Sequence, residues 1–235
     1  GSCGIEETVA VMAAAQEARA DGFTHELSRS DFAAEFLNTE RLDRAALKTS
    51  SRLGSTTHVT AVDGDGRCAS VTCSNGTGSG VIVPGTGVHV NNMLGEEDLN
   101  PMGFHLWEPG ARLPSMMSPT LILRDGELEA GLGSAGSNRI RSAIVQTILR
   151  LVADGLGAAE AVAAPRVHFE AGALHTEPGI DPEALGRIEA RGVTIEHWVE
   201  PNPFFGGVQA VARNPGTGEM GGGGDPRREG AVAYA

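Results

Sequence analysis

The strongest constraint on the fold is a run of hairpin-like units that begins at residue 57. Each unit places two apolar or alternating stretches on either side of a short turn that is rich in Asp, Gly or Pro. The pairs are 57–62 with 67–74, 81–83 with 88–90, and 121–123 with 128–132. Alternation with a period of two, interrupted by turn residues, is typical of β-hairpins. Consecutive hairpins therefore predict an antiparallel sheet.

After residue 139 the apolar period becomes helical. Apolar residues predict a helix over 140–152 that stops at Asp154-Gly155, and a short one over 158–164 that Pro165 closes. Asp181 is the expected N-cap of another helix, with Pro182 at its first position and Gly192 at its end. Strands are expected at 193–199 and 208–212, whereas 221–224 contains only glycine and is expected to be irregular.

Residues 1–55 show a different pattern from the hairpin-like units that follow. Ile5, Val9 and Met12 share one face of an amphipathic helix predicted over 5–20. Residues 23–55 are interpreted as an extended connector with a short helix around 41–48. The order of helices and strands along the whole chain indicates an α+β layered fold.

Composition excludes several classes of partner. The 30 Asp and Glu outnumber the 18 Lys and Arg, for a net charge of −12, which disfavours nucleic acid and anionic membranes. No apolar run is long enough to span a membrane, and residues 1–10 contain no signal-peptide core, which slightly favours a cytoplasmic protein. The cysteines Cys3, Cys68 and Cys73 show no CxxC spacing, so we expect buried free thiols and neither a disulfide framework nor a zinc site. The histidines show no metal-ligand spacing either.

Thr56 lies where the first hairpin begins. If the Ser55–Thr56 bond is cut, the freed α-amine, with an ordinary pKa of about 7.7–8.0, serves as general base for the hydroxyl of the same residue. By spacing alone, a Thr-Thr pair entering a strand is usually structural.

From Thr56 onward the sequence resembles the small subunit of the γ-glutamyltransferases, which are N-terminal nucleophile hydrolases. The matching segments follow in the order of the family: 56–63 (TTHVTAVD), 65–66 (DG), 91–92 (NN), 117–120 (MSPT), 133–136 (GSAG) with 139–140 (RI), 164–168 (APRVH) and 225–227 (DPR). The resemblance implies a four-layer αββα sandwich, with residues 1–55 as the end of the large-subunit portion and 56–235 as the small-subunit-like catalytic portion. It implies self-cleavage between Ser55 and Thr56, no metal or organic cofactor, and assembly with the large-subunit portion of the same precursor, which is compatible with an oligomer of processed heterodimers.

The resemblance also assigns roles to individual residues. Thr56 is the implied nucleophile, and Ser74 is the second hydroxyl that hydrogen-bonds to it. Asn75, in a glycine-rich loop two residues shorter than usual, takes the place of the substrate-binding asparagine. The backbone N–H groups of Gly136 and Ser137 are the implied oxyanion hole. Ser137 replaces a frequent glycine, which leaves a backbone donor in place.

Other positions depart from the family pattern. Met93 stands where Gln or Glu usually contacts the α-amino group of a γ-glutamyl substrate, and Met93 is at most a weak acceptor. Glu96 stands where the family has a shorter carboxylate. Ser115 and Met116 replace two adjacent serines that bind the substrate carboxylate, so half of that contact is missing. These departures predict an altered substrate pocket. The residues implied in acyl transfer are unchanged.

Structural interpretations stand beside these assignments. The acidic stretch 96–98 is also typical of a solvated loop, and 131–136 of an ordinary turn or, since Arg139 and a helix follow, of a phosphate-binding loop without the P-loop lysine. Core packing or a pocket wall would explain Met93, Met116 and Met117. We expect His58 to be packed or hydrogen-bonded, Arg166 and His168 to be structural, and Arg227 to hold the C-terminus through an ion pair.

Three functions remain. The first is a γ-glutamyl transferase or hydrolase of glutathione-like compounds. The second, favoured by the altered pocket, is a specialised hydrolase or acyltransferase that acts on another small molecule, at an amide or at a C–C bond beside a carbonyl. Such an enzyme suits a bacterial biosynthetic pathway, for example that of an antibiotic. The third is an uncleaved, non-catalytic homologue.

Overall fold

The computed structural model describes residues 4–18, 56–96, 99–100 and 103–235. Within them, helix α1 (Ile5–Ala18) buries Val9 and packs Ile5 and Met12 against the same apolar cluster, so the amphipathic helix is confirmed. The connector over 23–55, its short helix around 41–48, and Ser55 lie outside the described residues.

The first predicted hairpin is confirmed. Strands β1 (Thr56–Val62) and β2 (Cys68–Ser74) pair antiparallel from Thr56 opposite Ser74 to Val62 opposite Cys68. The turn between them closes on one side chain, since Oδ1 of Asp63 accepts hydrogen bonds from the backbone N–H groups of Asp65 (3.0 Å) and Arg67 (2.9 Å).

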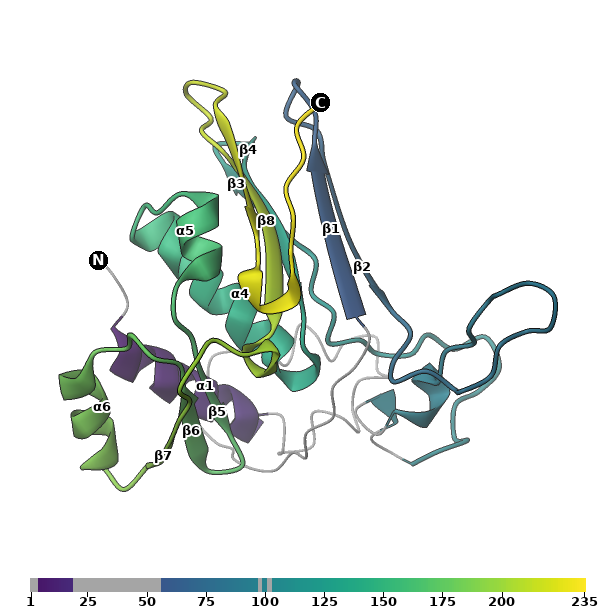
Figure 1. The fold of residues 1–235 in the computed structure, drawn as a ribbon, viewed down its shortest axis with the longest axis horizontal. Helices are drawn as coiled ribbons and strands as arrows, with labels where there is room; N and C mark the ends of the chain where they lie inside the picture. The colour runs from purple at the N-terminus through teal and green to yellow at the C-terminus, as the bar shows by residue number, and fades with distance from the viewer. Residues whose placement is uncertain (1–3, 19–55, 97–98, 101–102) are drawn as a thin grey trace.

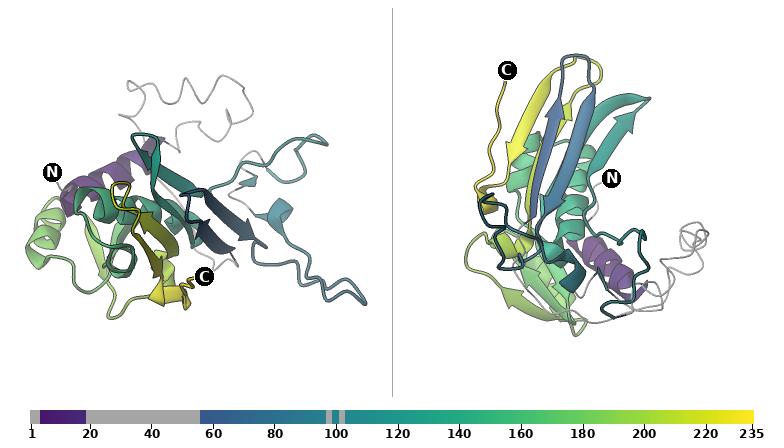
Figure 2. Two further views of the ribbon diagram at one scale, coloured as in Figure 1. Left: turned by 90° about the horizontal axis from the view of Figure 1, so that it is seen from above. Right: turned by 90° about the vertical axis from the view of Figure 1, so that its right-hand side faces the viewer.

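A four-stranded antiparallel sheet forms the centre of the molecule (Figure 1). Its strands are, in spatial order, β3 (Thr120–Arg124), β4 (Glu127–Ala135), β8 (Gly207–Arg213) and β9 (Met220–Gly224). Helices α4 (Ile140–Ile148), extended by a π-helical turn Leu149–Ala153, and α5 (Ala158–Ala163) cover one face. The β1–β2 hairpin covers the other face. Figure 2 (right) shows this hairpin along its whole length, in front of the four-stranded sheet. Buried apolar side chains of β4, β8, α4 and α5 fill the space between helices and sheet.

Strand β9 corrects the expectation that residues 221–224 are irregular. These glycines are strand residues because they pair with β8. A Cβ on Gly223 would lie 2.7 Å from the Ala158 carbonyl carbon, and one on Gly222 would lie 3.0 Å from a methyl group of Val232. Close packing therefore explains glycine at 222–224, whereas a Cβ on Gly221 would meet nothing within 4 Å.

A separate three-stranded sheet lies beside α1. Strands β5 (Val167–Glu170) and β6 (Ala173–Thr176) pair antiparallel, and β7 (Thr194–His197) runs parallel to β6. Helix α6 (Pro182–Glu189) connects β6 to β7 and begins as predicted, with the Asp181 side chain accepting a hydrogen bond from the N–H of Glu183. The apolar pattern does not predict β5 and β6, because these four-residue strands lie outside any longer alternating run such as 193–199, which predicts β7.

The second hairpin-like unit is not a pair of strands. Only Ile82 and His89 form an isolated β-bridge, and Val83 and Val90 donate backbone hydrogen bonds across the loop. Val81 and Ile82 are 57% and 61% exposed, so no core lies beneath this apolar sequence.

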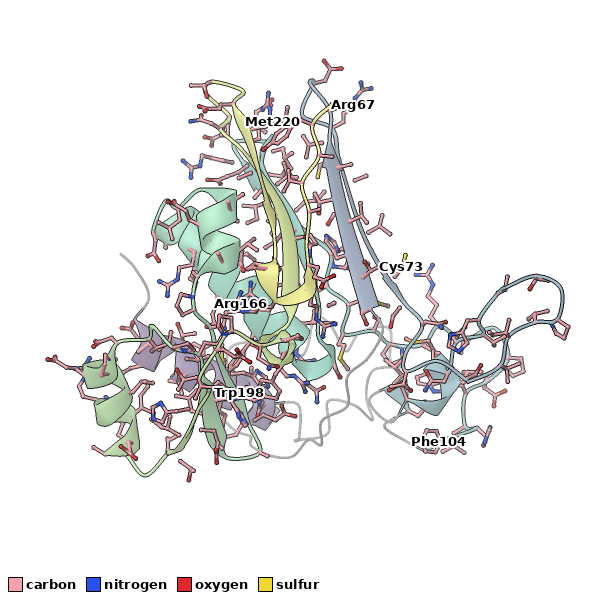
Figure 3. The ribbon with its side chains drawn as sticks, viewed as in Figure 1. Arg67, Cys73, Phe104, Arg166, Trp198 and Met220 are labelled. Atoms are coloured by element: carbon pink, nitrogen blue, oxygen red, sulfur yellow. The ribbon has the colours of Figure 1, made fainter. Side chains whose placement is uncertain are left out.

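The expectation of buried thiols is wrong for the described cysteines. Cys68 and Cys73 are both free, but Cys73 is exposed and Cys68 is partly buried (Figure 3). Burial raises the pKa of the Cys68 thiol. Cys3 lies outside the described residues.

The observed architecture is α+β. The described residues supply a helical layer (α4 and α5), the four-stranded sheet, and the β1–β2 hairpin as the start of a second β layer.

Candidate active site

Packing of β4 against β1 determines which residues meet at the start of β1. A Cβ on Gly131 would lie 2.9 Å from a methyl carbon of Thr60, and one on Gly133 would lie 2.8 Å from Cγ of His58. The two strands therefore run antiparallel across the interface between the layers. Continuing by the same two-residue step places Ala135 level with Thr56, at the end of β4 where the chain turns into Gly136.

Thr56 and Ser74 are joined directly. Thr56 Oγ1 and Ser74 Oγ are 3.0 Å apart, a hydrogen bond in which either hydroxyl can donate. Ser74 Oγ also accepts a hydrogen bond from the backbone N–H of Gly76 at 3.1 Å. Both hydroxyls are partly buried, so Thr56 is reachable from solvent while its orientation is fixed.

His58 supports this strand end as a structural residue. Its side chain is buried, and its ring nitrogens lie 2.7 Å from Thr72 Oγ1 and 2.8 Å from Thr60 Oγ1. Burial lowers its pKa, so the neutral ring is favoured. The prediction of a packed, hydrogen-bonded histidine is confirmed.

The turn after β4 has an unusual backbone. Gly136 has φ 134° and Ser137 has φ 52°, the left-handed region that most side chains avoid. A Cβ on Gly136 would lie 2.7 Å from Cα of Gly206, so only glycine fits there. The N–H of Arg139 closes the turn on the carbonyl of Gly136 at 3.0 Å. Residues 131–135 belong to strand β4, so neither the ordinary turn nor the phosphate-binding loop describes that segment.

Asn92, to which the sequence assigns no role beyond the matching pair 91–92, organises the loop that follows Ser74. Its Oδ1 accepts hydrogen bonds from the N–H groups of Thr77 (2.8 Å) and Gly78 (3.1 Å). Its Nδ2 donates to Oε1 of Glu96 at 2.9 Å, and the N–H of Thr77 donates to the same oxygen at 3.1 Å. Glu96 is therefore hydrogen-bonded within this loop, and residues 97–98 of the acidic stretch lie outside the described residues.

The other expected substrate-binding residues occupy several segments. Asn75 follows Ser74 directly, and its side chain is hydrogen-bonded to His89 Nδ1 at 3.2 Å. Met93 begins the one-turn helix Met93–Gly95 and is partly buried. Ser115 is exposed and accepts a hydrogen bond from the N–H of Met117. Met116 and Met117 pack against the apolar cluster between the four-stranded sheet and helices α4 and α5.

A buried ionic cluster holds the C-terminal segment. Asp225 pairs with Arg166 at 2.7 Å and with Arg227 at 3.1 Å, and Arg227 pairs with Glu177 at 2.5 Å (Arg166 is labelled in Figure 3). The predictions of a structural Arg166 and of an Arg227 ion pair are confirmed. His168 is buried and hydrogen-bonded to Ser142, which also agrees with a structural role.

The described part of the chain shows neither a metal-ligand cluster nor a membrane-spanning helix. No cluster of three or more His, Cys, Asp or Glu side chains there is arranged to hold a metal ion. None of its helices is long and apolar enough to cross a membrane.

Comparisons with known proteins identify relatives along nearly the whole chain. The family model described as gamma-glutamyltranspeptidase matches residues 8–235. The capsule biosynthesis protein CapD proenzyme of Bacillus anthracis is 32% identical over 199 residues, which are 83% of this chain and 36% of the relative. The acylase ACY 1 proenzyme of Pseudomonas sp. (strain SE83) is 38% identical over 68% of this chain and 28% of its own length. The glutathione hydrolase proenzyme of Escherichia coli (strain K12) is 31% identical over 73% of this chain and 31% of its own length.

Solved structures agree with these matches. The gamma-glutamyltranspeptidase from Pseudomonas nitroreducens complexed with L-DON superposes with a TM-score of 0.63 at 28% identity, covering 76% of this chain and 99% of that chain. The Bacillus anthracis transpeptidase enzyme CapD gives a TM-score of 0.60 at 28% identity, with the same coverage of 76% and 99%. The chain thus spans about a third of the length of its curated relatives, 36% and 28% for the first two.

Proposed function

The chain belongs to the gamma-glutamyltranspeptidase family, and on this premise we propose that the protein containing it is a self-cleaving N-terminal threonine hydrolase or acyltransferase. The observation that carries the proposal is the 3.0 Å hydrogen bond between Thr56 and Ser74 at the start of β1. The antiparallel packing of β4 on β1 supports it, because the Gly136–Ser137 turn follows the end of β4 that lies level with Thr56. Residues 56–235 are then the small-subunit-like catalytic portion.

The proposed reaction needs only groups of this chain. Cleavage of the Ser55–Thr56 bond frees the α-amine of Thr56, which accepts the proton of its own hydroxyl as Oγ1 attacks a substrate carbonyl. Ser74 holds Oγ1 in place, and the N–H groups of Gly136 and Ser137 stabilise the negative oxygen of the tetrahedral intermediate. The leaving group takes the proton from the amine, which leaves an acyl ester on Thr56. Water or an amine then attacks that ester by the same route and regenerates the hydroxyl.

N-terminal sequencing of the purified full-length protein tests self-cleavage. We expect two chains, the smaller beginning with Thr56. Thr56→Ala should leave a single chain, while the neighbouring exposed Thr57→Ala should cleave normally because its side chain points away from Ser74. A wild-type protein with an intact Ser55–Thr56 bond would contradict the proposal and favour the non-catalytic homologue.

We also propose that the pocket accepts an acyl group other than γ-glutamyl, at an amide or at a C–C bond beside a carbonyl. Glu96 has one methylene more than the shorter carboxylate of the family pattern, and its Oε1 is held within the loop by hydrogen bonds from Asn92 and Thr77. Met93 and Met116 stand where the family pattern has polar contacts, so those contacts to a γ-glutamyl group are missing. A specialised biosynthetic step fits this pocket, and an ordinary γ-glutamyl transferase of glutathione-like substrates is the alternative.

A matched pair of chromogenic substrates separates these alternatives. Glutaryl-p-nitroanilide lacks only the α-amino group of γ-glutamyl-p-nitroanilide. We expect kcat/KM for the γ-glutamyl compound to be no higher than for the glutaryl compound, because the contact for the amino group is weakened. A γ-glutamyl preference of about 100-fold or more, roughly 2.7 kcal/mol, would support the ordinary transferase.

The remaining partner that we propose is the large-subunit portion of the same precursor. The outer face of the β1–β2 hairpin is exposed and partly apolar, with Val59 at 62% and Val71 at 53% exposure (Figure 2, right). Exposed apolar faces of this kind mark association surfaces. Val59→Asp should reduce copurification of the two processed chains, whereas Val199→Asp, at a position that is 94% exposed outside this face, should not. Equal copurification would contradict this interface.

A further inference from the structure

The turn that carries the proposed oxyanion donors is held by a buried side chain of its own. Arg139, the last residue of the 3₁₀ turn Ser137–Arg139, is 2% exposed. Its Nε donates a hydrogen bond to the carbonyl of Phe204 at 3.1 Å, and its guanidinium carbon lies 4.5 Å from the centre of the Phe204 ring. Arg139 thereby attaches the turn to the segment before β8.

A second set of contacts closes a ring around the same turn. Arg139 Nη1 lies 3.5 Å from Oε2 of Glu170, and that oxygen lies 3.2 Å from Nε2 of His168. His168 Nδ1 is 2.8 Å from Ser142 Oγ, which is itself 3.0 Å from the carbonyl oxygen of Arg139. The contacts therefore lead from the Arg139 side chain, through β5 and α4, back to the Arg139 backbone.

His168 is buried within this ring of contacts, and its burial favours the neutral form of the imidazole. Burial lowers the pKa of His168, although Glu170 acts in the opposite direction. Ser142 donates its one hydroxyl proton to the carbonyl of Arg139, so the neutral His168 ring carries its proton on Nδ1 and donates it to Ser142 Oγ. The guanidinium of Arg139 thus supplies the positive charge that the buried Glu170 requires.

The turn needs such support because its conformation is strained. Ser137 occupies the left-handed region without being glycine, and Gly136 lies against the backbone of Gly206 with no room for adjustment. Strained backbone persists where surrounding contacts determine it. Arg139 binds Phe204, two residues before Gly206, so it holds both sides of this close contact.

We propose that Arg139 is a positioning residue for the acyl-transfer reaction, and that Glu170 acts through it. Arg139 fixes the direction of the Gly136 and Ser137 N–H groups, and Glu170 and Phe204 fix Arg139. This inference rests on the proposed function, since it concerns the donors of that same site. Arg139 itself touches no reacting atom.

The test uses the full-length protein and counts active sites as chains that begin with Thr56. Arg139→Met keeps an unbranched side chain and removes the contacts to Glu170 and Phe204. Arg150→Met is the matched control, because Arg150 follows α4 and pairs only with Asp154 among the contacts described, at 2.8 Å. Amide hydrolysis is measured as kcat per active site and KM, on whichever anilide the wild type cleaves faster.

We expect Arg139→Met to lower kcat by about 10- to 100-fold with KM changed by less than about threefold. The loss is smaller than the 10²–10³-fold cost of deleting an oxyanion donor, because the donors remain but are displaced. Glu170→Gln should lower kcat by about three- to tenfold, by loosening the guanidinium. The double variant should lose no more than Arg139→Met alone, since both act on the same turn.

A purely structural role would lower the number of active sites and leave kcat per site unchanged, which would overturn the inference. Multiplying losses in the double variant, or an equal loss in Arg150→Met, would also overturn it. If Arg139→Met does not fold or process, Glu170→Gln decides: an unchanged kcat per site refutes the inference. A wild type that is neither cleaved before Thr56 nor active refutes the proposed function and this inference with it, whereas an active wild type with an unaffected Arg139→Met refutes this inference alone.

Discussion

Gly223→Ala is the sharpest test of how closely β9 packs against α5. The added methyl group would lie 2.7 Å from the carbonyl carbon of Ala158 and 3.0 Å from Cγ2 of Val162. Neither neighbour can rotate away: the first is helix backbone, and Val162 is 0% exposed in the core. The strand must therefore move.

The size of the effect follows from that movement. A distance of 2.7 Å is about 0.7 Å short of the ordinary 3.4 Å contact. A radial gap of about 0.5–1 Å forfeits roughly a quarter to a half of the dispersion energy of the contacts it opens. Overpacking of a core costs about 1–3 kcal/mol, and replacement of glycine returns about 0.4–1 kcal/mol through the unfolded chain. We expect a net loss of about 1.3 kcal/mol and a correspondingly lower Tm.

Thermal unfolding of the full-length protein measures this loss. Gly221→Ala is the matched control, because it lies in the same strand and its Cβ would meet nothing within 4 Å. Its Tm should equal that of the wild type or exceed it slightly. Equal Tm values for the two variants would refute the claim that close packing, and not strand formation as such, requires glycine at residue 223.

Three further outcomes are expected. Asp225→Ala leaves Arg227 buried without one of its carboxylate partners and should cost about 3–5 kcal/mol in urea unfolding; a cost below about 1 kcal/mol would contradict the buried cluster. Ser74→Ala removes the hydrogen bond to Thr56 and should lower kcat per cleaved chain by up to about tenfold, which corresponds to roughly 1.4 kcal/mol. An unchanged kcat would argue against a role of Ser74 in holding the nucleophile. Burial lowers the pKa of His58 below the ordinary 6.5, so the unfolded chain binds its proton first. Its contribution to stability is complete above about pH 6.5 and is lost as pH falls below that value; His58→Gln should reduce this slope, and an identical pH dependence in the variant would contradict the assignment.

Local sequence patterns were sufficient to predict the elements that have a long period or a clear end signal. The β1–β2 hairpin, the helix from Ile140 and the cap at Asp181 depend on neighbours within a few residues, and such contacts are encoded locally. The order of motifs from Thr56 to Arg227 was sufficient to indicate the family. The juxtaposition of Thr56 with Ser74 also follows from the hairpin register, once the turn is placed.

The remaining features depend on contacts between elements that are distant in the sequence. Glycine is required at 222–224 because α5 and the C-terminal segment lie too close for side chains, and the apolar stretch 81–90 is exposed because none of the described elements packs over it. The role of Arg139 is invisible in sequence, since Glu170 and Phe204 are distant along the chain and meet it only when β5 and the segment before β8 pack together. Local patterns report the period of one element, whereas burial, close contact and ion pairing depend on which elements meet.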